Sequence, residues 1–165
     1  MRKIQLRFAA DAMLGKLAKW LRLMGIDTLY VRFCDLKGIK AILEDNRIFL
    51  TRNNGLYTQL RKEYGDDERI YLVEANIPAE QLKEISKKFE IALSNRFRLC
   101  SICNFPIKKV SRKAVQNKVP EYIFHTHEEF YFCPSCKRIY WSGSHLQNMR
   151  GKIAGILSDR ESFSG

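Results

Sequence analysis

The chain has 165 residues, of which 45% are hydrophobic, so a folded domain with a small satellite is expected and disordered or fibrous classes are excluded. No apolar run reaches the ~20 residues of a membrane-spanning helix, and the first residues lack the apolar stretch of a secretory signal, which predicts a cytoplasmic protein. The formal net charge of +11 favours a polyanionic partner such as nucleic acid.

The first 90 residues alternate between strand-like and helix-like patterns. Strand patterns are found at Ile4–Ala9, Thr28–Val31, Arg47–Thr51 and Arg69–Val73. Helix patterns lie between and after them, at 11–25, Leu36–Glu44, Leu56–Tyr64 and Ala79–Phe89. This alternation predicts an α/β domain over residues 1–95, with a mainly parallel sheet flanked by helices.

The character of the sequence changes after residue 95. Short strand-like pieces occur at Tyr122–Phe124, Phe130–Phe132 and Arg138–Trp141, with too few aliphatic residues for an independent core. After a capping candidate at Ser144, apolar residues recur at helical spacing and predict a final helix that packs on one of the two parts. Residues 96–165 are therefore expected to form a small second domain with a C-terminal helix.

Four of the five cysteines form two Cys-x-x-Cys pairs. Cys100 and Cys103 make the first pair, and Cys133 and Cys136 make the second; 29 residues separate the two pairs. Each pair can form a tight knuckle whose two sulfurs converge on one ion, so the spacing predicts a zinc ribbon. Four protein ligands leave no open coordination position, which makes the zinc structural, and metal binding would substitute for the missing core. Four unconnected thiols and an iron–sulfur cluster are the alternatives.

Three polar residues follow consecutive predicted strands at their carboxyl ends. Asp11 follows the first strand, Asp35 the second and Asn53 the third. Sites in parallel sheets gather at this edge, and two carboxylates with one amide oxygen could hold Mg²⁺ or Mn²⁺. Asp and Asn are also good helix N-caps, and each of the three positions precedes a predicted helix. Convergence of the side chains on one pocket would separate a site from mere capping.

Basic residues surround this predicted edge and also fill the ribbon. Seven basic residues and no acidic one lie between Arg96 and Lys118. The predicted contacts to a nucleic-acid backbone are Lys16, Lys19 and Arg22 on the first helix, Arg52 beside Asn53, and Lys108, Lys109, Arg112 and Lys113 in the ribbon. Solvated charged faces are the alternative reading of the same pattern.

Four segments resemble the Mut-seven C-terminal RNase domain family. They are DAMLGKLAKWLRLMGIDTLY at 11–30, RIFLTRN at 47–53, CSICN at 100–104 and CPSCKRIYWSGSH at 133–145. The opening pattern of the family, Asp-x-Met-Leu-Gly-x-Leu-Ala-x-x-Leu-Arg, is met in full, and its second acid matches Asp35. The resemblance extends from about residue 8 to 149 and implies a PIN-like nuclease fold followed by a zinc ribbon.

The chain departs from the family at one position of the site. The family pattern is Leu-Thr-Arg-Asp, whereas Leu50, Thr51 and Arg52 are followed here by Asn53. The change removes one negative charge and any general-base role but keeps an oxygen ligand. The resemblance implies a divalent-metal-dependent ribonuclease with Asp11, Asp35 and Asn53 around the metal, weak or inactive because of Asn53. The alternative is a non-catalytic RNA- or ribosome-binding module that uses the basic ribbon.

Overall fold

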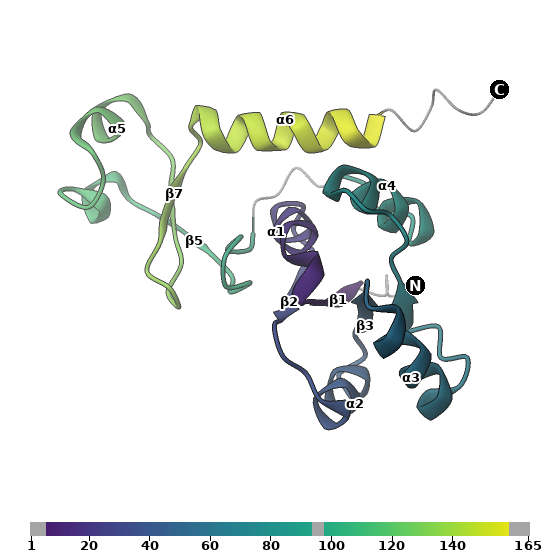
Figure 1. Cartoon of the computed structure of the whole chain (residues 1–165). Coiled ribbons are helices and arrows are strands. Elements are labelled where there is room, and N and C mark those ends of the chain that lie inside the picture. Colours follow the sequence, from purple (N-terminus) through teal and green to yellow (C-terminus); the bar gives the residue numbers. More distant parts are fainter. Residues whose placement is uncertain (1–5, 94–97, 159–165) are drawn as a thin grey trace, which may run out of the picture.

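The computed structural model describes residues 6–93 and 98–158 and consists of an α/β part and a ribbon part (Figure 1). The strands of the α/β part are β1 (Arg7–Asp11), β2 (Asp27–Val31), β3 (Ile48–Thr51) and β4 (Ile70–Leu72). Its helices are η1 (Ala12–Leu14), α1 (Gly15–Leu23), α2 (Leu36–Glu44), α3 (Asn54–Tyr64) and α4 (Pro78–Lys88). The prediction of an α/β fold with a parallel sheet flanked by helices is confirmed.

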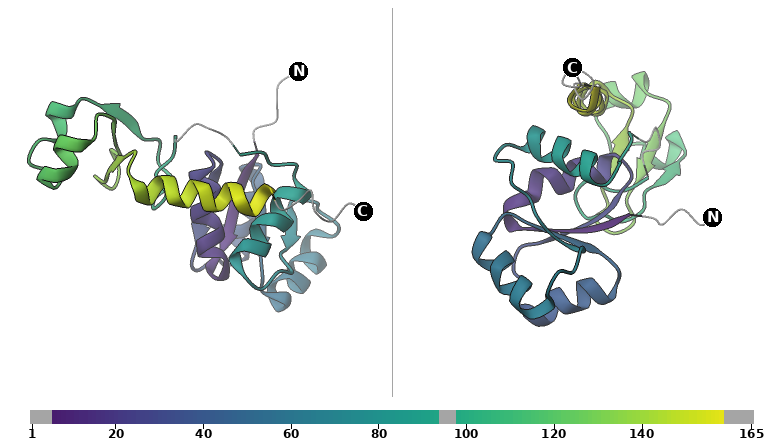
Figure 2. Two further views of the ribbon diagram at one scale, coloured as in Figure 1. Left: turned by 90° about the horizontal axis from the view of Figure 1, so that it is seen from above. Right: turned by 90° about the vertical axis from the view of Figure 1, so that its right-hand side faces the viewer.

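The four strands form a parallel sheet in the order β2-β1-β3-β4, which places β1 beside both β2 and β3. Helices cover both faces of this sheet (Figure 2). Alternate residues of β1 point to opposite faces: Phe8 and Ala10 pack in the cluster with α1 and α4, and Ala9 packs in the cluster with α2. Asp11 is therefore at the carboxyl end of an inner strand, with neighbours on both sides.

The ribbon part has an antiparallel sheet in the order β5-β6-β7. Its elements are β5 (Lys108–Val110), η2 (Arg112–Val115), α5 (Glu121–Thr126), β6 (Phe130–Phe132) and β7 (Ile139–Trp141), followed by α6 (Ser144–Ser158). Residues 94–97, which contain the predicted domain boundary, lie outside the described residues, so that boundary stays a prediction. No helix in the described part of the chain is long and apolar enough to span a membrane.

The final helix α6 packs on the α/β part. Ile153 and Ile156 are buried in the same hydrophobic cluster as the inward face of α4, including Leu82 and Ile85. The helix thus extends from the ribbon across the helices on one face of the parallel sheet (Figures 1 and 2). The predicted helix is confirmed, and its partner is the α/β part.

One predicted element of the ribbon is wrong. The strand-like run Tyr122–Phe124 lies within the short helix α5, which begins directly after Pro120. The hydroxyl of Thr126 donates to the carbonyl of Tyr122 at 2.7 Å, and the Arg112 guanidinium donates to the carbonyl of Phe124 at 2.8 Å. The Arg112 contact satisfies a carbonyl that the last turn of a short helix leaves without a helical partner, so local structure overrides the aromatic β propensity.

Candidate functional site

Asp11 is held rigidly at the end of β1. Its side chain is 8% exposed, and both carboxylate oxygens accept hydrogen bonds. One oxygen accepts from the backbone N–H of Met13 at 2.9 Å, which caps η1. The other accepts from the Thr51 hydroxyl at 2.5 Å and from the backbone N–H of Arg52 at 3.0 Å. Each oxygen of a carboxylate can accept more than one bond, so coordination capacity remains.

Asp35 and Asn53 both act as helix N-caps. Asp35 accepts from the backbone N–H of Gly38 at 2.8 Å at the start of α2. Asn53 accepts from the backbone N–H of Leu56 at 3.0 Å at the start of α3. The capping prediction is therefore correct for all three residues, and capping alone does not separate a site from local structure.

Two of the three residues line the same cavity. Asp11 and Asn53 line one surface cavity of about 260 Å³, together with residues that follow β2, including Arg32 and Phe33. Asp35 is exposed and is not among the residues that line this cavity. The structure thus brings Asp11 and Asn53 together and leaves Asp35 at the margin.

Sequence reasoning missed three residues of this cavity region. Thr51 is fully buried, and its hydroxyl donates to Asp11 while accepting from the backbone N–H of Asn53 at 3.0 Å. Thr51 therefore joins the two polar residues of the cavity. Met13 and Phe33, which also line it, are 57% and 95% exposed. Their signal in the sequence was an apolar side chain at a strand end, beside polar residues of the site.

The basic stripe predicted on α1 is only partly present. Lys16 is exposed, with its ammonium 5.4 Å from the centre of the Trp20 ring, and Lys19 is half-buried. The prediction that Arg22 contacts a nucleic-acid backbone is wrong, because this residue is only 5% exposed. Its guanidinium donates to the carbonyls of Thr28 and Ile102, each at 2.7 Å, and so docks the ribbon on the α/β part. Arg22 is therefore structural and not available to a nucleic-acid backbone.

The other predicted basic contacts have different environments. Arg52 is half-buried and hydrogen-bonds the side chain of Asn76, away from the Asp11 cavity lining. Lys109 pairs with Glu129 at 2.5 Å, and the Arg112 guanidinium lies 4.7 Å from the centre of the Phe124 ring. Lys108 and Lys113 are exposed. Contacts of these residues to RNA stay predictions.

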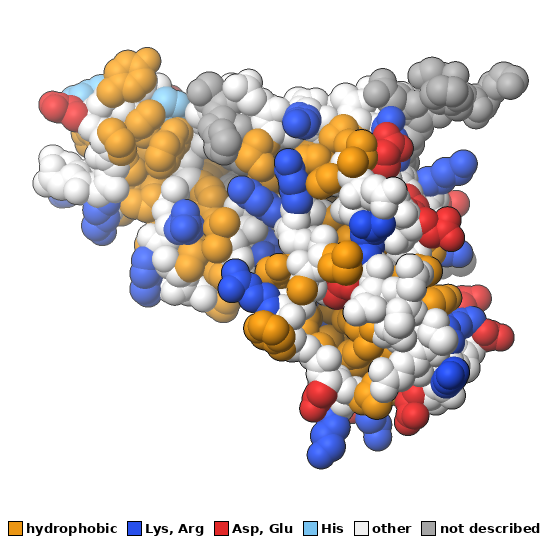
Figure 3. All heavy atoms as spheres, in the orientation of Figure 1, with side chains coloured by type: hydrophobic (Ala, Val, Ile, Leu, Met, Phe, Trp, Pro, Cys, Tyr) orange, Lys and Arg blue, Asp and Glu red, His pale blue; other side chains and the backbone are white. Residues whose placement is uncertain are grey.

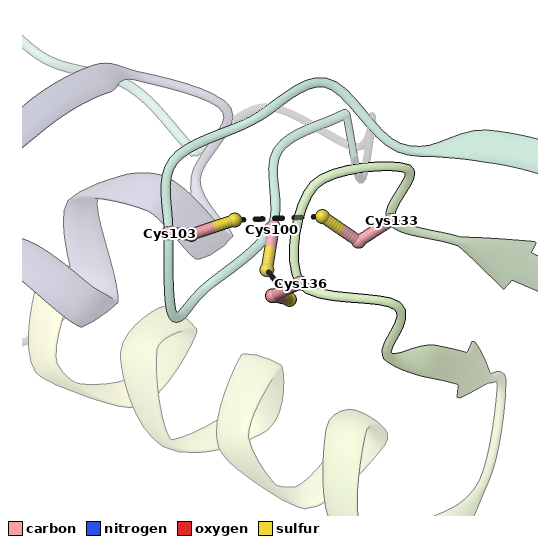
Figure 4. A group of neighbouring side chains, drawn as sticks. All are labelled: Cys100, Cys103, Cys133 and Cys136. Atoms are coloured by element: carbon pink, nitrogen blue, oxygen red, sulfur yellow. Dashed lines mark hydrogen bonds between the residues drawn. The ribbon is translucent and has the colours of Figure 1, made fainter.

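The four predicted cysteine ligands converge. Their sulfurs all lie within 4.8 Å of one another, and Cys100 and Cys133 are buried (Figure 4). The Sγ atoms are 3.5 Å apart for Cys100 and Cys136 and 3.4 Å apart for Cys103 and Cys133. A tetrahedral site with Zn–S distances of about 2.3 Å places its sulfurs about 3.8 Å apart. The donor set and spacing fit a structural zinc ion.

The two knuckles share one backbone geometry. In the first, the backbone carbonyl of Cys100 accepts from the N–H of Asn104 at 3.0 Å. In the second, the backbone carbonyl of Cys133 accepts from the N–H of Lys137 at 2.9 Å. Asn104 and Lys137 both have positive φ angles, 66° and 62°, which close the two turns in the same way. This repetition brings four sulfurs from distant segments to one point.

Tyr140 supports the cluster from β7. Its hydroxyl lies 2.9 Å from the Cys100 sulfur. Burial raises the pKa of Tyr140, so the hydroxyl stays protonated and can donate to a thiolate. Hydrogen bonds of this kind orient metal ligands.

Fold and sites together define an α/β protein with a polar cavity at the carboxyl edge of a parallel sheet and a four-cysteine ribbon that can hold zinc. A family model described as Mut7-C RNAse domain matches residues 6–153, most of the chain, and the chain belongs to this family. The suspected family is thus confirmed, and a nuclease-like role follows from it. No curated protein and no solved structure matches the chain.

Proposed function

We propose that the protein is a PIN-like ribonuclease that hydrolyses RNA phosphodiester bonds with a divalent cation, and that Asn53 makes it weak. The observation that carries the proposal is the position of Asp11, buried at the end of β1 and facing a cavity that it shares with Asn53. Family membership supports RNA as the substrate class.

The donor set suits a hard cation but is incomplete. Asp11 supplies a carboxylate and Asn53 an amide oxygen to the same cavity, and Asp35 would have to turn from its cap to join them. When bound, Mg²⁺ or Mn²⁺ activates water and neutralises charge on the phosphodiester. Among the described residues, the only group of three or more Cys, His, Asp or Glu side chains that could share an ion is the cysteine cluster. Weak cation binding follows from this.

The residues at this cavity have different roles in the proposed reaction. Thr51 and the backbone N–H of Arg52 fix the Asp11 carboxylate, so Asp11 needs little rearrangement to bind an ion. Asn53 is neutral and cannot accept a proton from water, so it serves only as an oxygen ligand. Phe33, almost fully exposed at the rim, offers an aromatic face to an unstacked base of single-stranded RNA.

The decisive experiment is Mn²⁺-dependent cleavage of an end-labelled single-stranded RNA by the unaltered chain and by Asn53→Asp. Asp and Asn are equivalent N-caps, so this variant changes the cavity charge with little effect on α3. We expect weak cleavage by the unaltered chain and a gain of about tenfold or more for Asn53→Asp, equivalent to about 1.4 kcal/mol of barrier. Adding Asp11→Asn should abolish the gain.

Asn54→Asp is the matched control. Asn54 is the exposed first residue of α3 and does not line the cavity, so the same charge change there should leave cleavage unaltered. An Asn53→Asp variant that binds Mn²⁺ and RNA but stays inert would overturn the ribonuclease proposal.

The non-catalytic RNA- or ribosome-binding module remains the second candidate. Asn53, and the place of Asp35 outside the cavity, favour it. In that case RNA binding would persist in every variant above, and cleavage would appear in none.

A further inference from the structure

Strand β7 lies between two surface cavities. One, of about 240 Å³, is formed where α1, the first knuckle and α6 meet the strand, with Lys19 and Met149 in its wall. The other, of about 300 Å³, lies on the ribbon and includes Lys118 and Lys137. Arg138 and the residues of β7, ending at Trp141, line both. We refer to these two as the β7 cavities.

The β7 cavities are positively charged. Their described lining residues include Lys19, Lys118, Lys137 and Arg138, and no Asp or Glu. Within residues 6–93 and 98–158, no ion pair is found for any of these four side chains. Four thiolates with one Zn²⁺ would carry two negative charges, so a positive excess remains. The cavities therefore suit an anion from outside the chain.

Two residues of the neighbouring basic run are engaged within the ribbon. Lys109 pairs with Glu129, and Arg112 stacks on Phe124 and donates to its carbonyl. On the face shown in Figure 3, Lys and Arg side chains occupy the region between α1 and the ribbon, and most acidic side chains lie over α2, α3 and α4. Lys108 and Lys113 of that run are exposed, and Lys118, its last residue, lines a β7 cavity. Of the β7 cations, Lys137 has its ammonium 5.9 Å from the centre of the Phe132 ring.

Trp141 gives the β7 cavities an aromatic surface. It is half-buried, with the His127 ring edge-on at 6.5 Å, which holds the indole in place. Gly143 packs closely against the edge of the indole, because a Cβ at this residue would lie 2.7 Å from the indole nitrogen. An indole next to cations that have no acidic partner among the described residues is the combination that binds a base and its phosphates in single strands.

We propose that the β7 cavities bind single-stranded RNA, with Trp141 stacking on a base and Lys19 and Arg138 contacting phosphates. The inference rests on RNA being the substrate under the proposed function. It assigns the RNA contact of the ribbon to β7 instead of to Lys108, Lys109, Arg112 and Lys113. The short helix η1 and then α1 follow Asp11, and Lys19 lies eight residues on, about 12 Å along a helix. A short single-stranded RNA can therefore extend from the Asp11 cavity to the β7 cavities.

The test is binding of a fluorescein-labelled 12-nucleotide single-stranded RNA, measured by anisotropy without added Mg²⁺ or Mn²⁺ so that no cleavage intervenes. We expect Arg138→Gln and Lys19→Gln each to weaken binding about threefold to tenfold. Each should also reduce the slope of log affinity against log salt by roughly 0.7, the contribution of one phosphate on a single strand. Lys87→Gln, at an exposed lysine in the last turn of α4, is the matched control and should change neither quantity.

Trp141 is tested by its fluorescence. The chain has two tryptophans, and Trp20 is 4% exposed, so RNA should quench mainly the Trp141 emission. Trp141→Phe keeps an aromatic ring and should retain most of the affinity while losing the quenching. Zinc content and circular dichroism of each variant identify any that fail to fold.

Three results would overturn the inference: unchanged affinity in both Arg138→Gln and Lys19→Gln, equal affinity for a duplex of the same sequence, or no quenching in the unaltered chain. The ribonuclease proposal fails separately. If Asn53→Asp stays inert while Arg138→Gln weakens RNA binding, only the ribonuclease proposal is refuted. If Asn53→Asp cleaves RNA while Arg138→Gln binds RNA normally, only the proposed β7 site is refuted.

Discussion

Asp27 is the residue whose removal tests how the two parts of the chain are joined. It begins β2 at the amino edge of the sheet, opposite the candidate site. The Arg47 guanidinium, whose side chain is 6% exposed, contacts both of its carboxylate oxygens, at 2.8 and 3.0 Å. Asn104 of the first knuckle donates to the same carboxylate at 2.6 Å and accepts from the backbone N–H of Thr28. Asp27 therefore links a buried arginine to the ribbon.

The magnitude follows from its pKa. Burial on its own would raise the pKa of Asp27, but hydrogen bonds from Arg47 and Asn104 outweigh burial and lower it from 3.8 to about 2. A depression of this size corresponds to at most about 2.4 kcal/mol of folding free energy. The carboxyl side chain is 25% exposed, so solvent screening reduces this to about 1–2 kcal/mol. Asp27→Asn should lower the free energy of unfolding at pH 7 by that amount.

The pH dependence has a defined sign. Because the folded pKa is depressed, the carboxylate stabilises the protein above pH 4, and the contribution is lost as pH falls through about 2. Urea unfolding at pH 7 and pH 3 measures this, and about half of the difference between the unaltered chain and Asp27→Asn should remain at pH 3.

Asp45 provides the control. Arg7, which also donates to Asp27 at 3.2 Å, and Arg47 both contact Asp45. The Asp45 side chain is 49% exposed, so Asp45→Asn should destabilise less. A loss for Asp27→Asn that is equal at both pH values, or no larger than the loss for Asp45→Asn, would refute the reasoning.

Three further predictions concern the sites. Purified protein should contain one zinc per chain by elemental analysis, and Cys133→Ser should lower that content and loosen the ribbon, measured by hydrogen exchange. In the Asn53→Asp background, Thr51→Val should reduce Mn²⁺-dependent cleavage at least tenfold with little change in RNA binding, because Asp11 loses its hydroxyl partner; Thr51→Ser should restore it. Phe33→Ala should weaken single-stranded RNA binding several-fold, whereas Tyr122→Ala, an exposed aromatic on α5, should not.

Local patterns predicted most elements of the α/β part because their signals are local. The first strand was predicted at Ile4–Ala9, of which residues 4 and 5 lie outside the described residues, whereas β1 spans Arg7–Asp11 and includes Asp11. The residue pattern of Leu36–Glu44 predicted α2 at its observed bounds. Gly25, with a φ of 81°, ends the first helical segment as predicted. The four-cysteine cluster was predictable for the same reason, since the residues of each Cys-x-x-Cys pair form a turn that brings their two sulfurs together. Where the local signal is weak, as at Tyr122–Phe124 beside Pro120, a strand was predicted and a helix formed.

Residues whose role depends on distant contacts could not be predicted. Arg22 lies on the polar side of a helix by spacing, and its burial comes from carbonyls about eighty residues further along the chain. Thr51 gave no signal beyond strand propensity, because its function is to donate to Asp11, forty residues earlier. Asp35 was predicted to follow the second strand; it caps α2 four residues after β2 ends, and the pattern did not show that it would not line the cavity.

The first cysteine knuckle also contacts the α/β part, so its structure affects more than the ribbon. Arg22 donates to the carbonyls of Ser101 and Ile102, which lie between the two cysteines of that knuckle. A buried guanidinium without acceptors is costly, so the knuckle that supplies them also stabilises the α/β part. Lys19, one turn before Arg22, lines the first β7 cavity together with the same two knuckle residues. We therefore expect removal of zinc to disturb both the wall of this cavity and the acceptors of Arg22, because the first knuckle supplies both.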